Sequence, residues 1–351
     1  MNLLLKTGLA SGLDKLGLLA ALRHLRSSKK GIVLTFHRVL RDCDKYLSYD
    51  PYLVMSESVF EQLLVLLQKE FQIVSLEEIL EHPEGVHQRQ RVALTFDDGW
   101  EDTYSVVSPH LLRCRLPATV FLCTRLIESG QMLPEERFGR IWQHCATTGQ
   151  LLPLTEDLRK WGAPPAQSRH RYQWAQYLKR LTLNTKLVLL SHLEESYRVP
   201  ADLRRRLLDW EEAATMARNN ITFGSHTANH CTLTAEQDTN ILLELKRSRQ
   251  DLRERLGVDA QFLAYPNGCF NPRIMNLARE AGFQNAFTTE IAYVTRKTNP
   301  FAVPRFSMDD FVVSGQSAAL HPSRARLYLQ ALSLQSVARH IPSIFQPVTV
   351  A

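Results

Sequence analysis

The stretch Thr95-Phe96-Asp97-Asp98-Gly99 ends an apolar run that begins at Arg91. That run, RVALTF, predicts a buried strand, and Gly99 permits a sharp turn after it. Two like charges side by side are costly to bury unless a cation or a proton compensates them. A metal ion bound by one aspartate would lower that cost and leave the other free as a base. The alternative is an ordinary Asp-Asp-Gly turn that caps a helix.

Apolar strands and amphipathic helices alternate on both sides of this stretch. The predicted strands are Gly31–Phe36, Phe71–Val74, Arg91–Phe96, Ala118–Thr124, Ile221–Gly224, Gln261–Tyr265, Ala286–Thr289 and Val303–Phe306. The predicted helices are Ser56–Lys69, one capped by Ser75, one from the capping pattern Thr234…Gln237 to Gly257, Arg273–Ala281 and His321–His340. Repeated strand-then-helix units imply a parallel sheet, open or closed into a barrel. Chemistry in such folds lies at the carboxyl ends of the strands.

The regular alternation stops over residues 125–210, which are polar and predicted to be a largely helical insertion without a chemical motif. The tryptophans dispersed through it are expected in its core. Residues 31–312 then form the main domain, and residues 313–351 a C-terminal helical tail. Residues 1–30 predict an amphipathic helix with a basic end rather than a signal peptide. This helix either packs on the domain or lies on an anionic membrane face.

Composition narrows the class of protein. The chain has 351 residues, of which 44% are hydrophobic and 22% are charged, values typical of a soluble globular protein. Its net charge of +6 permits an anionic partner, but acidic residues interrupt the basic stretches, so nucleic acid is not expected as a partner. The six cysteines form no CxxC pair, which disfavours a thiolate zinc site and suggests free thiols in a cytoplasmic, reducing compartment.

A second motif, Gly224-Ser225-His226-Thr227-Ala228-Asn229-His230, follows another predicted strand. Its two histidines are four residues apart, so one helical turn would place both imidazoles on one face. Asp98 is the natural third ligand of a metal site with an open position. A pair of surface histidines is the alternative reading of this motif alone.

A third motif, Phe262-Leu263-Ala264-Tyr265-Pro266-Asn267-Gly268, lies at another predicted strand end. Pro-Asn-Gly favours a tight turn that can point backbone N–H groups into a site. Taken alone, the motif is interpreted as an ordinary loop.

These three motifs, in this order, resemble the polysaccharide deacetylase family, also called the NodB-homology family or carbohydrate esterase family four. The family's TFDDG motif is present at Thr95–Gly99 and its H-[ST]-x-x-H motif at His226–His230, and Thr35–Val39 looks like the "YHRV" opening of many bacterial members. The resemblance covers roughly residues 31–310, with 125–210 as an insertion. It implies an α/β fold, a distorted (β/α) barrel with fewer than eight strands, and hydrolysis of an N-acetyl group on a sugar.

The resemblance also implies roles for individual residues. Asp98, His226 and His230 match the family's divalent-metal ligands, and Asp97 matches the general base. Zinc suits two imidazoles and one carboxylate, and cobalt or nickel would fit as well. The metal and a backbone N–H, that of Asn267 in the third motif, would hold the oxyanion.

Two further aromatic residues are expected near a sugar substrate. Trp100 lies beside the aspartate pair and could stack on a sugar ring, with a place in the core as the alternative. Tyr265 belongs to the third motif and is expected beside the oxyanion site.

The third motif departs from the family pattern R-x-P-Y-G. Ala264 stands where the family has the arginine that orients the base, and Asn267 stands where it has tyrosine. Arg305, in Val303-Pro304-Arg305-Phe306 at a late strand end, is the candidate substitute for that arginine.

The family's late Leu-x-His motif, which supplies the general acid in many members, has no counterpart here. Residues 291–310 contain no histidine. The candidate acid is therefore His37, at the end of the first strand, or Asp97 returning its proton. A structural histidine bonded to a loop carbonyl is the alternative for His37.

The sequence thus predicts a metal-dependent hydrolase that removes acetyl from an N-acetylated sugar. Without a recognised signal peptide, we expect a cytoplasmic enzyme with a small or lipid-linked glycan substrate. The membrane-bound alternative for residues 1–30 would suit a lipid-linked substrate. The alternatives are a deformylase on the same barrel and a catalytically silent, metal-containing glycan-binding protein. A phosphoesterase is disfavoured, because the sequence offers no second carboxylate-rich metal cluster.

Overall fold

The computed structural model describes residues 11–12, 30–50, 53–84, 89–127, 129–163, 171–202, 204, 206–315 and 319–330. Most of the helix predicted for residues 1–30 and the tail beyond residue 330 lie outside these residues. The proposed membrane contact therefore stays a prediction. Among the described helices, none is both long and apolar enough to cross a lipid bilayer.

A curled, all-parallel sheet forms the centre of the fold, in the order β10-β1-β5-β6-β7-β8-β9. Its strands are β1 (Ile32–Phe36), β5 (Arg91–Phe96), β6 (Ala118–Leu122), β7 (Ile221–Ser225), β8 (Phe262–Ala264), β9 (Asn285–Phe287) and β10 (Phe306–Ser307). The two-residue strand β4 (Gln72–Ile73) pairs with the amino-terminal end of β5. It lies on the same side of β5 as β6, which pairs with the carboxyl-terminal end. The predicted α/β fold, with a curled sheet of fewer than eight strands along its main path, is confirmed.

The segment before β10 connects the two edges of this sheet. Val303 donates its N–H to Ala286 O at 2.9 Å and accepts the N–H of Thr288 at 2.9 Å, so it pairs with β9. Three residues later, Phe306 is in register with Leu34 of β1. The strand predicted at Val303–Phe306 therefore begins late, at Phe306, because its first residues bridge from one edge strand to the other.

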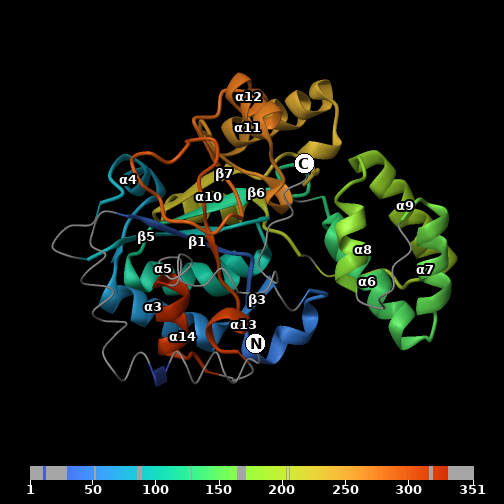
Figure 1. Ribbon diagram of the computed structural model, residues 1–351, viewed down its shortest axis with the longest axis horizontal. Coiled ribbons are helices and arrows are strands. Elements are labelled where there is room, and N and C mark those ends of the chain that lie inside the picture. The colour runs from blue at the N-terminus through green and yellow to red at the C-terminus, as the bar shows by residue number, and fades with distance from the viewer. Residues whose placement is uncertain are drawn as a thin grey trace.

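Helices cover the outside of the sheet (Figure 1). They are α3 (Glu57–Glu70), α4 (Leu76–Glu81), α5 (Ser108–Cys114), α10 (Trp210–Ala217), α11 (Asp238–Leu256), α12 (Pro272–Glu280), α13 (Asp310–Val313) and α14 (Pro322–Gln330). A separate parallel pair joins β2 (Arg38–Leu40) to β3 (Val54–Ser56). The cap at Ser75 is confirmed, since its side chain accepts the N–H of Glu78, and α11 ends at Gly257 in the left-handed conformation.

The predicted start of α11 at Thr234 is wrong. Thr234 lies within a 3₁₀ turn, Leu233–Ala235, whereas an N-cap residue needs an extended backbone. The helix begins at Asp238, after Gln237, which has that extended conformation.

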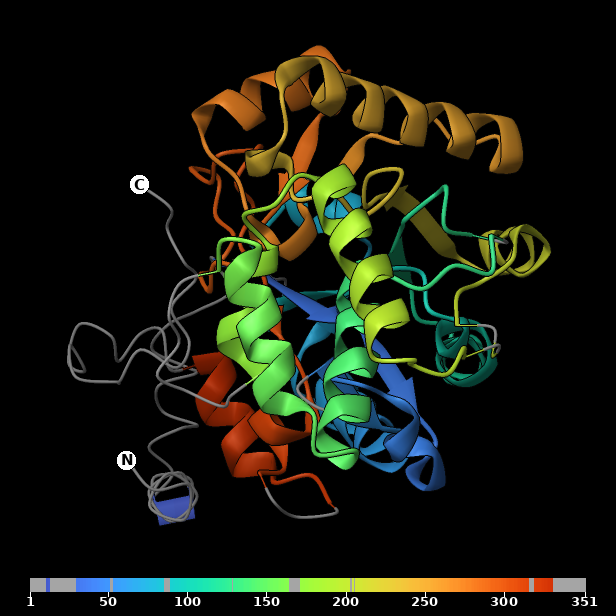
Figure 2. The ribbon, with the colours of Figure 1, turned by 90° about the vertical axis from the view of Figure 1, so that its right-hand side faces the viewer.

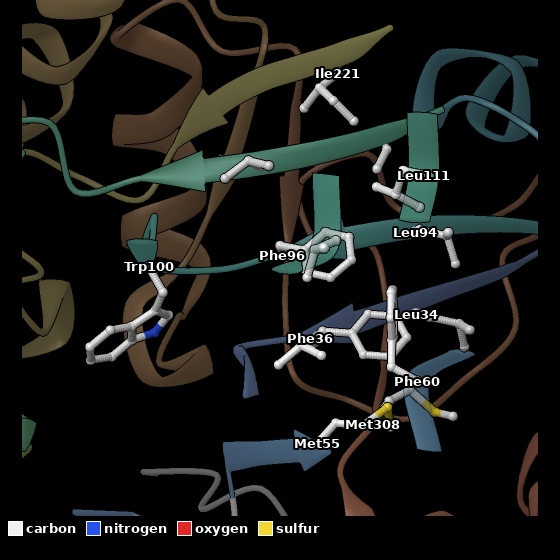
Figure 3. Close-up of a cluster of buried hydrophobic side chains, with 14 of the residues drawn as sticks. Leu34, Phe36, Met55, Phe60, Leu94, Phe96, Trp100, Leu111, Ile221 and Met308 are labelled. Atoms are coloured by element: carbon white, nitrogen blue, oxygen red, sulfur yellow. The ribbon is translucent and has the colours of Figure 1, made fainter. Parts of the chain in front are cut away.

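The main core lies between the sheet and helix α3. Figure 3 shows Phe36 of β1 and Phe96 of β5 side by side, with Phe60 of α3 beside them. The first two rings stack at 5.1 Å, and Phe60 meets them edge-on at 5.6 and 6.1 Å. All three side chains are fully buried. This packing fixes β1 and β5, whose carboxyl ends carry His37 and the aspartate pair.

Four helices within residues 125–210 form a group beside the sheet (Figures 1 and 2). They are α6 (Pro134–Thr147), α7 (Leu151–Lys160), α8 (Arg171–Leu178) and α9 (Leu183–Ser196). Buried residues of all four share one apolar cluster, which includes Trp142 and Trp174. The expectation that the dispersed tryptophans pack in a core is confirmed for these two. We call helices α6–α9 the helical subdomain.

Candidate functional site

The parallel strands bring the three sequence motifs to the same end of the sheet, where all the strands have their carboxyl ends. His37 follows β1, the pair Asp97 and Asp98 follows β5, His226 follows β7, and Asn267 lies in the turn after β8. Apart from His37 and Asn267, these side chains are almost completely buried. Buried ionisable groups at strand ends are costly, so each needs a partner.

Asp97 is held by a guanidinium fork. Arg305 donates from Nη1 to Asp97 Oδ1 and from Nη2 to Asp97 Oδ2, both at 2.7 Å. The fork is itself fixed by bonds from Nε to Thr288 O and from Nη1 to Thr95 Oγ1, at 3.1 and 3.3 Å. Arg305 has no exposed surface. The segment between β9 and β10 thus places the Arg305 guanidinium against Asp97, and its role in orienting the base stays a prediction.

The charge state of Asp97 follows from this pairing. Burial alone would raise the pKa of Asp97, but the charges of Arg305 and His226 outweigh it and lower the pKa below its usual value. The carboxylate is therefore ionised and able to accept a proton.

Asp98 and the two histidines converge on one point. Asp98 Oδ1 lies 3.3 Å from His226 Nε2 and 3.5 Å from His230 Nε2, and the three ligand atoms lie within 4.8 Å of one another. Zinc bonds of about 2.0–2.1 Å in tetrahedral geometry place ligand atoms about 3.3 Å apart. Asp98 Oδ1 is buried and has no well-aligned hydrogen-bond donor among the described residues. The three side chains therefore fit a divalent metal ion.

Both histidines turn the same nitrogen toward Asp98. His226 Nδ1 lies 2.8 Å from Ala264 O, and His230 Nδ1 lies 2.9 Å from Glu135 Oε2. A carbonyl oxygen only accepts hydrogen bonds, so Nδ1 of His226 carries a proton, and the ionised carboxylate imposes the same on His230. In a neutral ring Nε2 then offers its lone pair, as a metal ligand requires.

The predicted helical turn between the histidines is wrong. Residues 226–230 contain no helix, and the backbone takes left-handed conformations at Thr227 (φ 66°) and His230 (φ 55°). Two such residues fold the loop back, and the imidazole centroids come within 5.1 Å of each other. The four-residue spacing therefore brings the rings together through a strained loop.

Trp100 is a partner of Asp98. Its indole Nε1 donates to Asp98 Oδ2 at 2.9 Å, and its side chain is only 1% exposed. The Arg38 guanidinium lies over the ring at 4.5 Å, and Asp102 holds that arginine at 2.9 Å. The ring is therefore buried and its polar edge is engaged, as the core alternative expects, and contact between Trp100 and a sugar stays a prediction.

Tyr265 also has a structural place. Its ring is 1% exposed and stacks on Phe270 at 5.4 Å, and its hydroxyl donates to Phe301 O at 3.0 Å. A place for Tyr265 beside the oxyanion site stays a prediction. Asn267, two residues on, is partly exposed and left-handed (φ 59°), a conformation that asparagine tolerates. The oxyanion role of its backbone N–H stays a prediction.

His37 is partly exposed at the end of β1. Burial alone would raise the pKa of Asp97 and Asp98, and the charge of His37 is one of the influences that lower the pKa of both. It therefore lies close enough to both carboxylates to interact electrostatically. The general-acid role of His37 stays a proposal.

Sequence reasoning missed Glu135 of the helical subdomain. Besides the contact with His230, its Oε1 lies 3.3 Å from Lys186 Nζ and 3.4 Å from Asn267 Nδ2. Burial alone would raise the pKa of Glu135, but Lys186 and His230 hold it well below its usual value. Glu135 precedes His230 by 95 residues, and no motif marks it. Only the packing of the subdomain against the site reveals this contact.

Comparisons with known proteins show what this chain is similar to. The sequence model of the polysaccharide deacetylase family matches residues 84–286. The fold is similar to a Streptococcus pyogenes deacetylase, PplD, in complex with acetate (16% identity, TM-score 0.56, 86% of this chain and 99% of that chain). It is also similar to IcaB from Ammonifex degensii (16%, 0.54, 87% and 98%) and to a de-N-acetylase from Aggregatibacter actinomycetemcomitans (14%, 0.52, 86% and 100%). A comparison with curated protein sequences finds no match.

Proposed function

The chain belongs to the polysaccharide deacetylase family and is a deacetylase of the hydrolase class, and on this premise we propose that it is a metal-dependent enzyme that removes acetyl from an N-acetylated sugar. The observation that carries the proposal is the pairing of two differently held carboxylates. Asp98 faces two imidazole nitrogens, whereas Asp97 faces the guanidinium of Arg305. One carboxylate is thus arranged as a ligand and its neighbour as a base.

Asp98, His226 and His230 would hold the metal, with zinc as the first candidate and cobalt or nickel as alternatives. When bound, a divalent cation supplies Lewis acidity, which polarises an amide carbonyl and acidifies water. Trp100 fixes the second oxygen of Asp98, so that Oδ1 alone faces the histidines. Ala264 and Glu135 fix the orientations of the two imidazoles.

Asp97 would take the proton from the attacking water. Arg305 donates one hydrogen bond to each of its oxygens, so the carboxylate group is held in a fixed orientation toward the site. Collapse of the tetrahedral intermediate requires a proton on the leaving amine. His37 is the proposed donor, and Asp97 returning its proton is the alternative, because both border the site. Asn267 would supply a backbone N–H to the oxyanion.

Acetate release from a panel of N-acetylated sugars tests this proposal, with each N-formylated counterpart run beside it. We expect acetate from at least one sugar with the zinc-loaded wild type. Asp97→Asn removes the base while keeping the shape of the side chain, so we expect a loss of roughly 100-fold or more. His226→Ala removes a ligand, so its zinc content should fall together with its activity.

Three other outcomes would contradict the proposal. Formate release without acetate release would make the enzyme a deformylase. Sugar binding without any release would support a silent glycan-binding protein. Acetate release that survives both substitutions would place the reaction elsewhere in the molecule.

A further inference from the structure

The contact between Glu135 and His230 joins two parts of the molecule that are distant in sequence. Glu135 lies in the first turn of α6, in the helical subdomain, whereas His230 lies in the loop after β7. Their side chains meet at 2.9 Å between Oε2 and Nδ1. Through this contact, the helical subdomain reaches a side chain that also faces Asp98.

Glu135 is fixed from its other side as well. Lys186 of α9 lies 3.3 Å from Oε1 and 3.5 Å from Thr232 Oγ1, and its side chain has no exposed surface. A lysine without exposed surface is rare unless it is paired. Two helices of the subdomain thus hold one carboxylate against the histidine loop.

This arrangement has a consequence for His230. A carboxylate on Nδ1 keeps the proton on that nitrogen, sets the ring's orientation and makes Nε2 a better electron donor. Among the described residues, Ala264 O does the same for His226, but as a neutral carbonyl. The two histidines therefore have unequal support, and only that of His230 comes from the helical subdomain.

We propose that Glu135 is a positioning residue of the metal centre, and that the helical subdomain strengthens metal binding through it. This inference rests on the proposed metal site of Asp98, His226 and His230. It gives the subdomain a part in the site, although the sequence of residues 125–210 contains no chemical motif of its own.

The affinity for metal itself tests the inference, without any need for a substrate. Zinc dissociation constants are measured by competition with a chromophoric chelator, and the visible spectrum of the cobalt-loaded protein reports ligand geometry. We expect Glu135→Gln to weaken zinc binding roughly 10- to 100-fold and to change the cobalt spectrum. Glu194→Gln is the matched control, because Glu194 also pairs with arginines in the subdomain (Arg137 and Arg140) but contacts neither histidine.

Glu135→Gln removes the carboxylate that pairs with Lys186. An unpaired buried lysine could unfold the subdomain. The double variant Glu135→Gln/Lys186→Met removes both charges of the pair, the partly exposed carboxylate and the buried ammonium. It should fold, as judged by circular dichroism, and still bind zinc more weakly than the wild type.

The outcomes separate this inference from the proposed function. In one outcome the wild type binds zinc, His226→Ala does not, and the folded Glu135 variants bind zinc as tightly as the wild type. This outcome would overturn the role of Glu135 and leave the proposed metal site standing. An equal loss in Glu135→Gln and Glu194→Gln would also overturn it, since the effect would not be specific to the contact. Failure of the wild type to bind zinc would instead contradict the proposed metal site.

Discussion

At the scale of single residues, backbone strain is concentrated at the site. Seven described residues other than glycine have a positive φ, and four of them belong to the three sequence motifs: Asp98, Thr227, His230 and Asn267. Such conformations cost on the order of 1–3 kcal/mol each and persist only where the surroundings impose them. At Asp98 and His230 the strained backbone carries a side chain that faces the proposed metal position.

Arg305→Lys tests the fork on Asp97. Lysine keeps the positive charge but cannot make two parallel bonds to one carboxylate, so the base loses its fixed orientation. We expect kcat for acetate release to fall roughly 10- to 100-fold, with little change in KM. Steady-state kinetics on the preferred sugar measures both.

Arg137→Lys is the matched control for this prediction. Arg137 also makes a two-pronged contact with a carboxylate, that of Glu194, but within the helical subdomain. Its substitution should leave kcat unchanged. A wild-type kcat in Arg305→Lys would show that the fork does not position the base.

The sequence predicted which residues meet at the site better than it predicted their contacts. Asp98 and the two histidines lie together because the carboxyl ends of parallel strands lie on one side of the sheet. The sequence predicts this, since the apolar run before each motif marks a buried strand. The burial of Trp100 and Tyr265 depends on how neighbouring elements cover them, which local sequence does not contain. The bond from the Trp100 indole N–H to Asp98, for example, cannot be read from the local sequence.

At the scale of elements, helix α13 has a titratable cap. The side chain of Asp309 accepts the N–H of Val312 at 2.8 Å. Burial, aided by the neighbouring charge of Asp310, raises the pKa of Asp309 to about 6. The protonated form is thus favoured in the folded protein relative to the unfolded chain.

This raised pKa predicts a pH dependence of stability. The folded pKa exceeds the unfolded value of about 3.9, so the contribution of Asp309 to stability is complete below about pH 4 and is lost as pH rises through 6. Asp309→Asn keeps a side-chain cap and removes the titration. The variant should gain stability relative to the wild type between pH 4 and 7, by up to about 3 kcal/mol at about 1.4 kcal/mol per pKa unit.

Urea unfolding of both proteins at pH 4.5, 5.5 and 7 measures this difference. A difference in unfolding free energy that stays constant across these pH values would contradict a raised pKa at Asp309.

Element types were more predictable than element boundaries. Long apolar runs gave β1, β5, β6 and β7, since a buried parallel strand has few polar residues. Helix α11 and strand β10 begin several residues later than the sequence predicts. A 3₁₀ turn precedes α11, and a segment that pairs with β9 precedes β10, and both contain the same residue types as the regular elements that follow. Tertiary hydrogen bonds therefore decide where these two elements begin.

At the scale of the whole molecule, the proposed metal site ties several elements together. Its ligands follow β5 and β7, and Glu135 of α6 supports one of them. A ligand that binds only the folded state stabilises it by about 2.7 kcal/mol at a hundredfold excess over its dissociation constant.

Metal removal should therefore lower the melting temperature. We expect chelation to reduce the Tm of the wild type by several degrees, and added zinc to restore it. Differential scanning calorimetry with and without zinc measures the shift. His226→Ala should show no zinc-dependent shift, and a shift as large as that of the wild type would place the stabilising ion elsewhere.

The proposed metal centre needs loops that follow two separate strands, β5 and β7, to share one ion. Anomalous diffraction at the zinc edge, from crystals grown with zinc, tests it most directly. We expect a peak about 2.0–2.2 Å from Asp98 Oδ1, His226 Nε2 and His230 Nε2. A zinc peak bound to other side chains, with none between these three atoms, would contradict it.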